Sequence, residues 1–410
     1  MRIFVYSLIY SYLCTQLGHN KRKMNKVMIA FVLCCCMISC IKDEAPNNGC
    51  DIESAWVEGP ELEKLFYETA EMRKENISST ETSITFVVRS MLMVPKQIAV
   101  NFKITDKATI EPASGSLQDF TNGPVTYTVT SEDGQWKRTY KVAFAEPVLS
   151  KSRHSFELAD TAEGGIFIKN RYHQFYEIDE NGETQRLWAS GNPGFALTLF
   201  SGAGPEEFPT YMSDAGYEGH CVRLETMSTG ELGKSMGKPI AAGNLFLGKF
   251  NVDMSAIEPL KATEFGVRWD REPVRVTGYY KYKPGKDFTN SNMEIDPNRT
   301  DEANIYAVFY RNVDADGKPY FLYGGDVADL DKILDNLLVY KVASVSSLPP
   351  TDQWTRFEMF FEGDEAPAEI VANKGCNLAI VFSSSKGGAW FEGAIGSILY
   401  VDEVEVWYER

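Results

Sequence analysis

The sequence predicts an all-β protein made of a small β-sandwich followed by a larger two-sheet jelly roll. Short apolar or alternating runs recur throughout, separated by Gly, Pro, Asn and Asp, and few stretches have helical spacing. The last segment, Ala379 to Tyr408, shows this pattern most clearly. Its apolar strand leads into a Ser- and Gly-rich loop, and a final strand alternates apolar and charged residues. Such a strand buries one face in a sandwich and leaves the other in water.

Residues 1–39 have the pattern of a bacterial lipoprotein signal peptide, and Met24 is an alternative start. From Met24 onward, a short basic segment precedes an apolar run from Val27 to Ile38 and then Ser39 before Cys40. The run is shorter than a membrane-spanning helix requires. We therefore predict cleavage before Cys40, a lipid on Cys40, and a lipid anchor and linker over residues 40–50.

The residues after Cys40 predict where the lipoprotein is delivered. Ile41, Lys42, Asp43 and Glu44 resemble the export signal of lipoproteins carried to the outer face of the outer membrane, in which a lysine is followed by two acids. An ordinary polar linker is the alternative interpretation. We predict an outer-membrane lipoprotein that is exposed on the cell surface.

Charge and cysteine content exclude several classes of function. Cleavage before Cys40 removes five basic and no acidic residues, which changes the net charge from −16 to −21. Such a surface repels nucleic-acid phosphates and anionic lipids, so we expect no nucleic-acid partner. Cys50, Cys221 and Cys376 lie too far apart in the sequence to indicate a disulfide framework, and no Cys/His cluster has zinc spacing.

Residues 51–149 contain the predicted small sandwich. Asp133-Gly134 is a hairpin turn signal, and a short helix is predicted over Glu61 to Arg73. The span Ala108 to Phe144 resembles the immunoglobulin-like modules that recur near the anchors of bacterial surface lipoproteins, which implies a spacer role. The predicted strands are Thr82–Val88, Gln97–Ile104, Val125–Thr130 and Trp136–Phe144.

Residues 150–410 contain the predicted jelly roll, with one short helix over Asp326 to Asn336. The predicted strands are Gly165–Ile168, Ala196–Leu199, Cys221–Thr226, Asn244–Phe250, Val274–Tyr282, Asn304–Tyr310, Tyr320–Tyr323, Leu337–Ala343, Thr355–Phe361, Leu378–Phe382 and Leu399–Tyr408.

Four blocks in this region together resemble one known family. They are Leu187–Leu197, Lys238–Phe250, Val276–Gly285 and Ser383–Val406. In this order they are similar to the putative carbohydrate metabolism domain, a family of surface lipoproteins from glycan-degrading Gram-negative bacteria. The resemblance covers Ser155 to Arg410. It implies a jelly roll similar to carbohydrate-binding modules, often preceded by an immunoglobulin-like module, and it brings no catalytic residues.

The residues themselves suggest how this domain holds a sugar. A pyranose has an apolar C–H face and a rim of hydroxyls, so a binder needs flat aromatic rings beside polar donors and acceptors. Strand alternation puts Tyr280 and Tyr282 on one face, with Tyr279 and Lys281 on the other. Core packing is the alternative role for each ring. The candidate carbohydrate-binding residues are Trp188, Asn192, Trp269, Tyr280, Tyr282, His220, Lys386 and Trp390.

Glu157 and Asp402 suggest a structural calcium site. They lie near the start and the end of the domain, as do the paired acids that hold calcium between the first and last strands of several carbohydrate-binding jelly rolls. Carboxylate oxygens suit that ion. Two ordinary surface acids are the alternative, and no cofactor is otherwise required.

Three functions remain open from the sequence. We predict a surface lipoprotein that binds a glycan or oligosaccharide and works beside other glycan-uptake proteins. A glycoside hydrolase or polysaccharide lyase is the first alternative, with His220 as the candidate base of a lyase, but the sequence marks no catalytic pair. A structural or adhesive lipoprotein without glycan affinity is the second.

Overall fold

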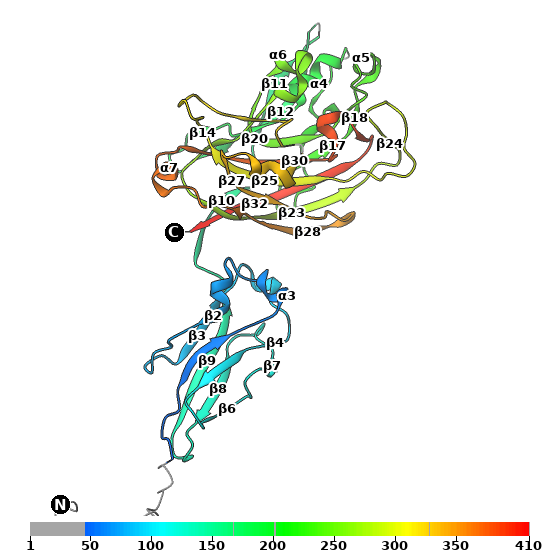
Figure 1. Cartoon of the computed structure of the whole chain (residues 1–410). Coiled ribbons are helices and arrows are strands. Elements are labelled where there is room, and N and C mark those ends of the chain that lie inside the picture. The colour runs from blue at the N-terminus through cyan, green and yellow to red at the C-terminus, as the bar shows by residue number, and fades with distance from the viewer. Residues whose placement is uncertain (1–45, 167, 201, 328, 410) are drawn as a thin grey trace, which may run out of the picture. The chain divides into compact units, whose positions relative to one another are not determined.

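The computed structural model describes residues 46–409 apart from 167, 201 and 328. These residues form two compact units, one ending at Pro147 and one beginning at Val148 (Figure 1). Strands dominate both, so the all-β prediction is confirmed. The predicted signal peptide and Cys40 lie outside the described residues. No described helix has the length and apolar character needed to cross a membrane.

The N-terminal unit is a β-sandwich, and its four predicted strand regions are confirmed. The predicted helix over Glu61 to Arg73 is wrong, because Leu65 and Phe66 turn into the core between two short helical turns, α3 (Pro60–Glu63) and η2 (Thr69–Met72). One sheet has the order β3 (Ser83–Val87), β9 (Lys137–Ala145), β8 (Val125–Thr130), β6 (Thr109–Glu111), another has β2 (Arg73–Lys74), β1 (Ile52–Trp56), β5 (Asn101–Ile104), and β4 (Ile98–Ala99) pairs with β7 (Leu117–Gln118).

The C-terminal unit contains two main antiparallel sheets that lie one above the other in Figure 1. The smaller sheet has the order β16 (Thr210–Ser213), β17 (Cys221–Glu225), β32 (Ile398–Glu409), β23 (Pro273–Lys283), β28 (Thr351–Phe360), and β10 (Leu149–His154) also pairs with β32. The larger sheet has the order β26 (Leu322–Tyr323), β21 (Thr263–Phe265), β20 (Asn244–Phe250), β30 (Cys376–Ser383), β25 (Asn304–Arg311), β27 (Val339–Ser344), β29 (Glu362–Gly363), with β15 (Trp188–Ala189) on β20 and β22 (Val267–Trp269) on β30.

The main core lies between these two sheets, and the larger sheet is covered on its outer face as well. Strand alternation sends Leu245 and Leu247 into the inter-sheet core and Phe246 into a second cluster on the outer face. This explains why the strands of the larger sheet read as continuous apolar runs. The outer face is therefore partly closed, and its open part forms the pocket described below.

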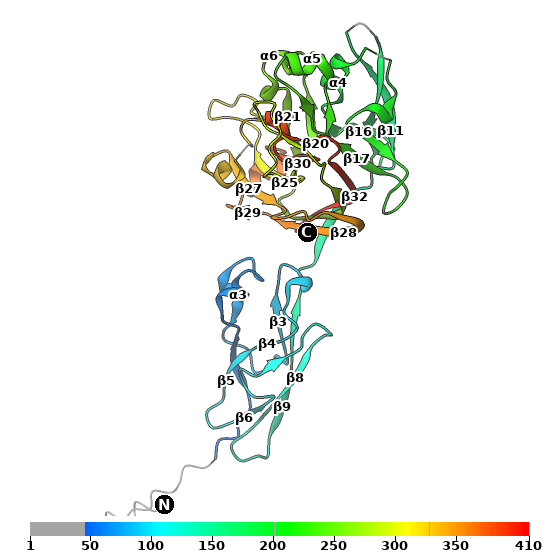
Figure 2. The same ribbon diagram turned by 90° about the vertical axis from the view of Figure 1, so that its right-hand side faces the viewer.

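Short helices gather at one end of the C-terminal unit, beyond β20 and β21 (Figure 2). Among them are α4 (Asn192–Phe195), α5 (Gly230–Ser235) and α6 (Val252–Ile257). The predicted strand over Ala196 to Leu199 is wrong, because α4 begins with Pro193 in its first turn and continues into the helical turn η4 (Ala196–Thr198).

Two other predicted elements also differ. The described residues of the predicted strand over Gly165 to Ile168 do not form a strand, because Gly165 has φ 121° and lies in the connection between β11 (Ala159–Gly164) and β12 (Asn170–Phe175). Among the described residues of the predicted helix over Asp326 to Asn336, the 3₁₀ turn η7 (Leu330–Asp335) is the only helical part.

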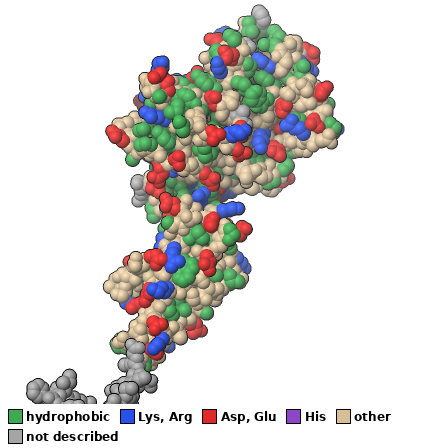
Figure 3. Space-filling view, viewed as in Figure 1, with side chains coloured by type: hydrophobic (Ala, Val, Ile, Leu, Met, Phe, Trp, Pro, Cys, Tyr) green, Lys and Arg blue, Asp and Glu red, His purple; other side chains and the backbone are tan. Residues whose placement is uncertain are grey.

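The surface carries both signs of charge. On the face seen in Figure 3, acidic and basic side chains are interspersed with apolar ones. The excess of acidic residues is therefore not gathered into one patch on that face.

Candidate functional site

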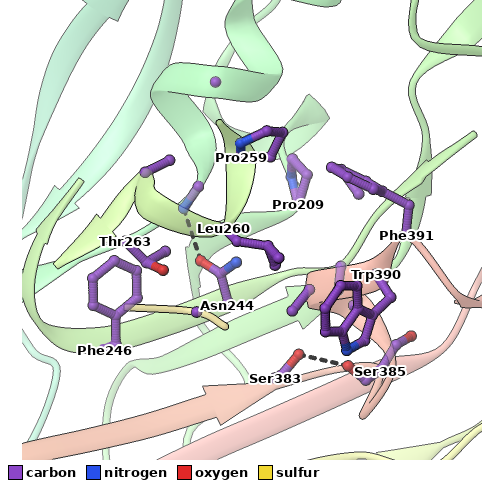
Figure 4. A pocket seen from close by; sticks show the side chains of 18 of the residues that line it. Pro209, Asn244, Phe246, Pro259, Leu260, Thr263, Ser383, Ser385, Trp390 and Phe391 are labelled. Carbon is purple, nitrogen blue, oxygen red and sulfur yellow. Dashed lines mark hydrogen bonds between the residues drawn. The ribbon is translucent and has the colours of Figure 1, made fainter. Parts of the chain in front are cut away.

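A pocket of about 800 Å³ lies between the outer face of the larger sheet and the short helices that cover it. Strands β20, β25, β27 and β30 supply its floor, and α4, α5, η6 (Pro259–Lys261) and η8 (Gly388–Trp390) supply parts of its walls. In Figure 4, the rings of Trp390 and Phe391 lie across the pocket from Phe246, with Asn244 and Leu260 between them.

The floor consists of a polar row beside an apolar row. Strand register aligns Asn244 of β20, Ser383 of β30 and Asn304 of β25, and all three line the pocket. Two residues along each strand, the next row contains Phe246, Val381 and Tyr306. Residues two apart point to the same face of a strand, so amides and a hydroxyl lie directly beside aromatic rings.

The polar row has donor and acceptor groups that remain available for hydrogen bonds to a ligand. The Asn244 side-chain oxygen accepts a hydrogen bond from the Gly191 backbone N–H at 2.7 Å, which fixes the amide and leaves its NH₂ group directed elsewhere. The Ser383 hydroxyl donates to the Ser385 carbonyl at 2.8 Å (Figure 4) and can still accept. The side-chain amide of Asn304 forms no hydrogen bond with any described residue. A hydroxyl-rich ligand would find both donors and acceptors here.

The aromatic wall comes from the loop between β30 and β32. Gly388 lets this loop pack closely against the segment before β20, because a Cβ there would lie 2.5 Å from the Cβ of Ala242. Phe391 has φ 58°, a left-handed conformation that costs a non-glycine residue about 1 kcal/mol. Trp390 remains 49% exposed, although large rings usually bury more of their surface. The loop therefore presents an open ring to the pocket.

Two lysines contribute positive charge to the pocket. Lys238 donates from Nζ to the Ser255 carbonyl at 3.0 Å and lies 5.8 Å from the centre of the Phe391 ring. Burial lowers the pKa of Lys238. The Lys386 side chain is 67% exposed, with its Nζ 3.8 Å from a Glu302 carboxylate oxygen. Both ammonium groups can donate to sugar hydroxyls or to an anionic substituent.

Of the predicted sugar-binding residues, Trp390, Lys386 and Asn192 line this pocket. Trp390 and Lys386 have surface to offer a ligand. Asn192 is only 1% exposed, and its amide exchanges two hydrogen bonds with the backbone of Thr210, at 2.7 and 3.2 Å. Asn192 therefore shapes the wall and has no free amide group for a sugar.

The expectation that Trp188, Tyr280 and Tyr282 present rings to a sugar is wrong. All three are 2–3% exposed and belong to the inter-sheet core. Tyr280 and Tyr282 lie there because both are on the face of β23 that points toward the other sheet, and Trp188 reaches the core from β15. Trp188 stacks on Phe382 at 5.8 Å between ring centres, and its indole N–H donates to Glu177 at 2.8 Å. Trp269 is half-buried and packs against the same core.

Glu157, His220 and Asp402 lie away from the pocket and meet at one loop. The Glu157 carboxylate accepts the His220 backbone N–H and lies 3.0 Å from its ring Nδ1, an interaction that raises the pKa of His220. Asp402 is fully buried and accepts the backbone N–H groups of Tyr217 and Glu218 at 2.7 and 3.1 Å. The two acids therefore hold the loop of residues 214–220 through its backbone.

This geometry fits a calcium ion poorly, because N–H groups already occupy oxygens of both carboxylates. Among the residues that the structure describes, no three His, Cys, Asp or Glu side chains group as metal ligands. Calcium at Glu157 and Asp402 is untested, and the alternative, two acids that hold the loop without a cation, fits these hydrogen bonds better. We expect EDTA to leave the melting temperature of the protein unchanged, since a cation that is not bound cannot stabilise the fold. A fall in melting temperature that added CaCl₂ reverses would instead support the ion.

Sequence reasoning missed the floor of the pocket. Asn244 and Asn304 each begin a buried strand and are followed two residues later by an aromatic residue, Phe246 or Tyr306. This repeated Asn-X-aromatic pattern was a usable signal. The pattern was not recognised as part of a site, because apolar residues surround both asparagines. Such apolar runs are typical of strands that are buried in a core.

Comparison with known families supports a carbohydrate-related role. Residues 156–407 match the family model described as "Putative carbohydrate metabolism domain". Residues 66–143 match the model described as "SGBP, N-terminal". The two matches confirm the family resemblance in the sequence, and the pocket lies within the first matched region.

Two solved structures are similar over most of their length. One, from Bacteroides thetaiotaomicron and described as a putative glycoside hydrolase, is 34% identical, with 90% of this chain and 99% of that chain covered and a TM-score of 0.55. The other, described in the same words and from Bacteroides vulgatus, is 39% identical, with 62% of this chain and 97% of that chain covered and a TM-score of 0.55. Among curated proteins, nothing matches.

Proposed function

The chain belongs to the putative carbohydrate metabolism domain family, and from this premise we propose that its C-terminal unit binds a glycan in the pocket on the larger sheet. The observation that carries the proposal is the row of Asn244, Ser383 and Asn304 in a pocket that the half-exposed ring of Trp390 also lines. A sugar ring needs this combination, because its C–H face packs on an aromatic ring while its hydroxyls exchange hydrogen bonds with amides.

The volume of the pocket and the accessible groups that line it also favour a saccharide. A volume of about 800 Å³ is in the range of pockets that hold small organic ligands. The half-exposed Trp390 offers a flat apolar surface, and the amide of Asn304 has no competing partner among the described residues. A purely adhesive lipoprotein would not require free amides beside an open ring.

Binding without catalysis is supported better than hydrolysis. The relatives described as putative glycoside hydrolases keep the enzyme alternative open. A glycosidase needs two carboxyl groups on opposite sides of the scissile bond. Among the described residues that line the pocket, the carboxylates are Asp329 and Asp331, which are neighbours on one segment. Asp329 also forms an ion pair with Lys332 at 2.8 Å. They do not make an opposed pair.

We expect Trp390→Ala to weaken glycan binding at least tenfold, which corresponds to about 1.4 kcal/mol. The loss follows from removing the open ring while the floor stays in place. Affinity electrophoresis of the purified protein in gels containing xylan, mannan, β-glucan or pectin measures it, with reducing-sugar release followed in parallel. Trp136→Ala is the matched control, because Trp136 is also exposed but belongs to the N-terminal unit.

Equal retardation of the wild type and Trp390→Ala in every gel that retards the wild type would contradict the pocket as the site. Release of reducing sugar by the wild type would establish the enzyme alternative. An absence of retardation in all gels would favour the adhesive alternative. Asn304→Ala adds an independent check on the floor, since it removes an amide without removing a ring.

We also propose that the protein is held at the outer membrane by a lipid on Cys40, facing the cell exterior beside other glycan-uptake proteins. The support is the sequence pattern from Met24 to Glu44, which lies outside the described residues. Cys40→Ala should move the protein from the membrane fraction to the soluble fraction of the cell envelope. Membrane retention of this variant, measured by fractionation and immunoblotting, would contradict lipid anchoring.

A further inference from the structure

The outward face of the smaller sheet carries a row of alternating aromatic and cationic side chains. Register places Tyr211 of β16 beside Arg223 of β17, Arg223 beside Tyr400 of β32, and Tyr400 beside Lys281 of β23. Trp354 of β28 follows, with its ring centre 4.5 Å from the Lys281 ammonium. The row crosses five neighbouring strands, a span of roughly 19 Å. We call these five residues the aromatic ladder.

Within the ladder, each cation lies between two rings. The Arg223 guanidinium is 5.1 Å from the Tyr211 ring centre and 5.8 Å from that of Tyr400. The Lys281 ammonium is 4.9 Å from the Tyr400 ring centre, on the side away from Arg223 along the row. Such cation–π contacts hold the side chains upright on the sheet and reduce the freedom they would lose on binding a ligand.

A further ring is held against the ladder by the loop of residues 214–220. Tyr217 stacks on Tyr279 with ring centres 3.8 Å apart and planes 9° apart, and it lies nearly perpendicular to Trp354, with ring centres 6.3 Å apart. Tyr217 is nevertheless 45% exposed. Tyr279 covers one face of the Tyr217 ring, and nearly half of the Tyr217 surface remains accessible to a ligand.

The loop that presents Tyr217 is fixed at an energetic cost. Asp402 is fully buried, and burial raises its pKa to about 6 although three backbone N–H groups bind it. Gly219 has φ 59°, and a Cβ there would lie 2.5 Å from the Glu157 carboxylate. A buried carboxylate and a left-handed turn that only glycine fits hold one exposed ring in place, as in a preorganised binding site.

The ladder contains one cation that is paired with an acid and one that is not. Arg223 is neutralised by Glu225 at 2.6 Å. Lys281 donates only a long hydrogen bond, 3.4 Å, to the Ala215 carbonyl, and no described acidic side chain pairs with it. The unpaired ammonium of Lys281, held between two rings, favours a partner that brings a negative charge to it.

We propose that the aromatic ladder, together with Tyr217 and Tyr279, is a second carbohydrate-binding surface that takes an acidic glycan. Sugar rings pack on Tyr217 and Trp354, and a carboxylate or sulfate group of the glycan pairs with Lys281. The surface is on the sheet opposite the pocket and shares no residue with it, so the proposal stands or falls separately from the pocket.

The proposal is tested by affinity electrophoresis in gels containing polygalacturonate, chondroitin sulfate or neutral mannan, at low and high salt. The wild type should be retarded by an acidic polymer, and less so in high salt, because salt screens the Lys281 charge. Tyr217→Ala and Lys281→Met should each weaken this retardation at least fivefold. Tyr217→Phe should retain it, since the ring and not the hydroxyl stacks. Polygalacturonate carries carboxylates alone, whereas chondroitin sulfate carries both carboxylates and sulfates. Retardation by both polymers therefore indicates recognition of a carboxylate, and retardation by chondroitin sulfate alone indicates recognition of a sulfate.

Two controls keep the result interpretable. Lys249→Met removes a charge from an exposed lysine on the larger sheet and should leave the retardation unchanged. A melting curve for each variant separates loss of binding from loss of fold. The proposal is overturned by wild-type levels of retardation in both Tyr217→Ala and Lys281→Met, by retardation in mannan alone, or by no retardation in either acidic polymer. Oligo(dT) binding that acidic glycans do not compete away would also overturn it.

Discussion

Replacing Trp188 by Ala is expected to lower the free energy of unfolding of the C-terminal unit by about 3–5 kcal/mol, the range for removing a large buried aromatic side chain. The ring packs on Phe382 and meets Phe156 edge-on at 5.2 Å between ring centres, so its loss opens a cavity in the inter-sheet core. It also removes the N–H donor to Glu177, whose carboxylate then keeps only His154 as a side-chain partner. Urea denaturation followed by circular dichroism measures the change.

Trp390→Ala is the matched comparison, because it removes the same side chain from an exposed position. It should change the free energy of unfolding by only about 0.5 kcal/mol. For Trp188→Ala, the fraction that remains folded should bind glycan as the wild type does. A Trp188→Ala protein of wild-type stability that had lost glycan binding would contradict the core assignment and return Trp188 to the binding site.

The contrast between Trp188 and Trp390 shows which features of the site can be predicted from the sequence alone. Strand alternation correctly separated Tyr280 and Tyr282 from Tyr279 and Lys281, because side chains of a strand alternate between two faces. It could not say which face meets the other sheet. That depends on pairing between strands far apart in sequence, such as β23 with β32. The pair chosen for sugar binding proved to be core, and the other pair faces outward.

The pocket shows the same limit of sequence analysis, because its residues come from segments that are far apart in the sequence. Trp390 and Lys386 were predictable, because a Gly-rich loop with an aromatic residue is exposed in most sandwiches. The floor was not, since Asn244, Ser383 and Asn304 become neighbours only when β20, β30 and β25 pair. The fold class needed only local periodicity, whereas the site needed the order of strands in the sheet.

Asp301 is a further residue that no local pattern marked, and it holds the aromatic wall in place. Its side chain is 3% exposed. One carboxylate oxygen accepts hydrogen bonds from the Ser385 hydroxyl at 2.5 Å, the Ser397 hydroxyl at 2.6 Å and the Ala394 backbone N–H at 2.7 Å. These three groups flank the loop that carries Trp390. Asp301 therefore ties both ends of that loop to the rest of the unit.

Asp301→Ala is expected to lower the free energy of unfolding by about 3–5 kcal/mol, because two buried hydroxyls and a buried N–H lose their shared charged acceptor. Glycan binding should fall with it, since the loop that presents Trp390 loses its anchor. Urea denaturation gives the first quantity and affinity electrophoresis the second. Wild-type stability in this variant would show that water or a neighbouring group replaces the carboxylate.

Asp301→Asn removes the negative charge of the side chain and keeps its shape, so it measures the contribution of the charge to stability. It keeps one acceptor oxygen and should cost about 1–3 kcal/mol. Burial raises the pKa of Asp301 above its ordinary value of 3.8, so the native carboxyl binds its proton at a higher pH than the unfolded one. The wild type therefore gains stability from this group as the pH falls toward 3.8, and the Asn variant does not. The stability difference between the two proteins should widen as the pH falls toward 3.8, and a difference that narrows would show that hydrogen bonding outweighs burial at this carboxyl.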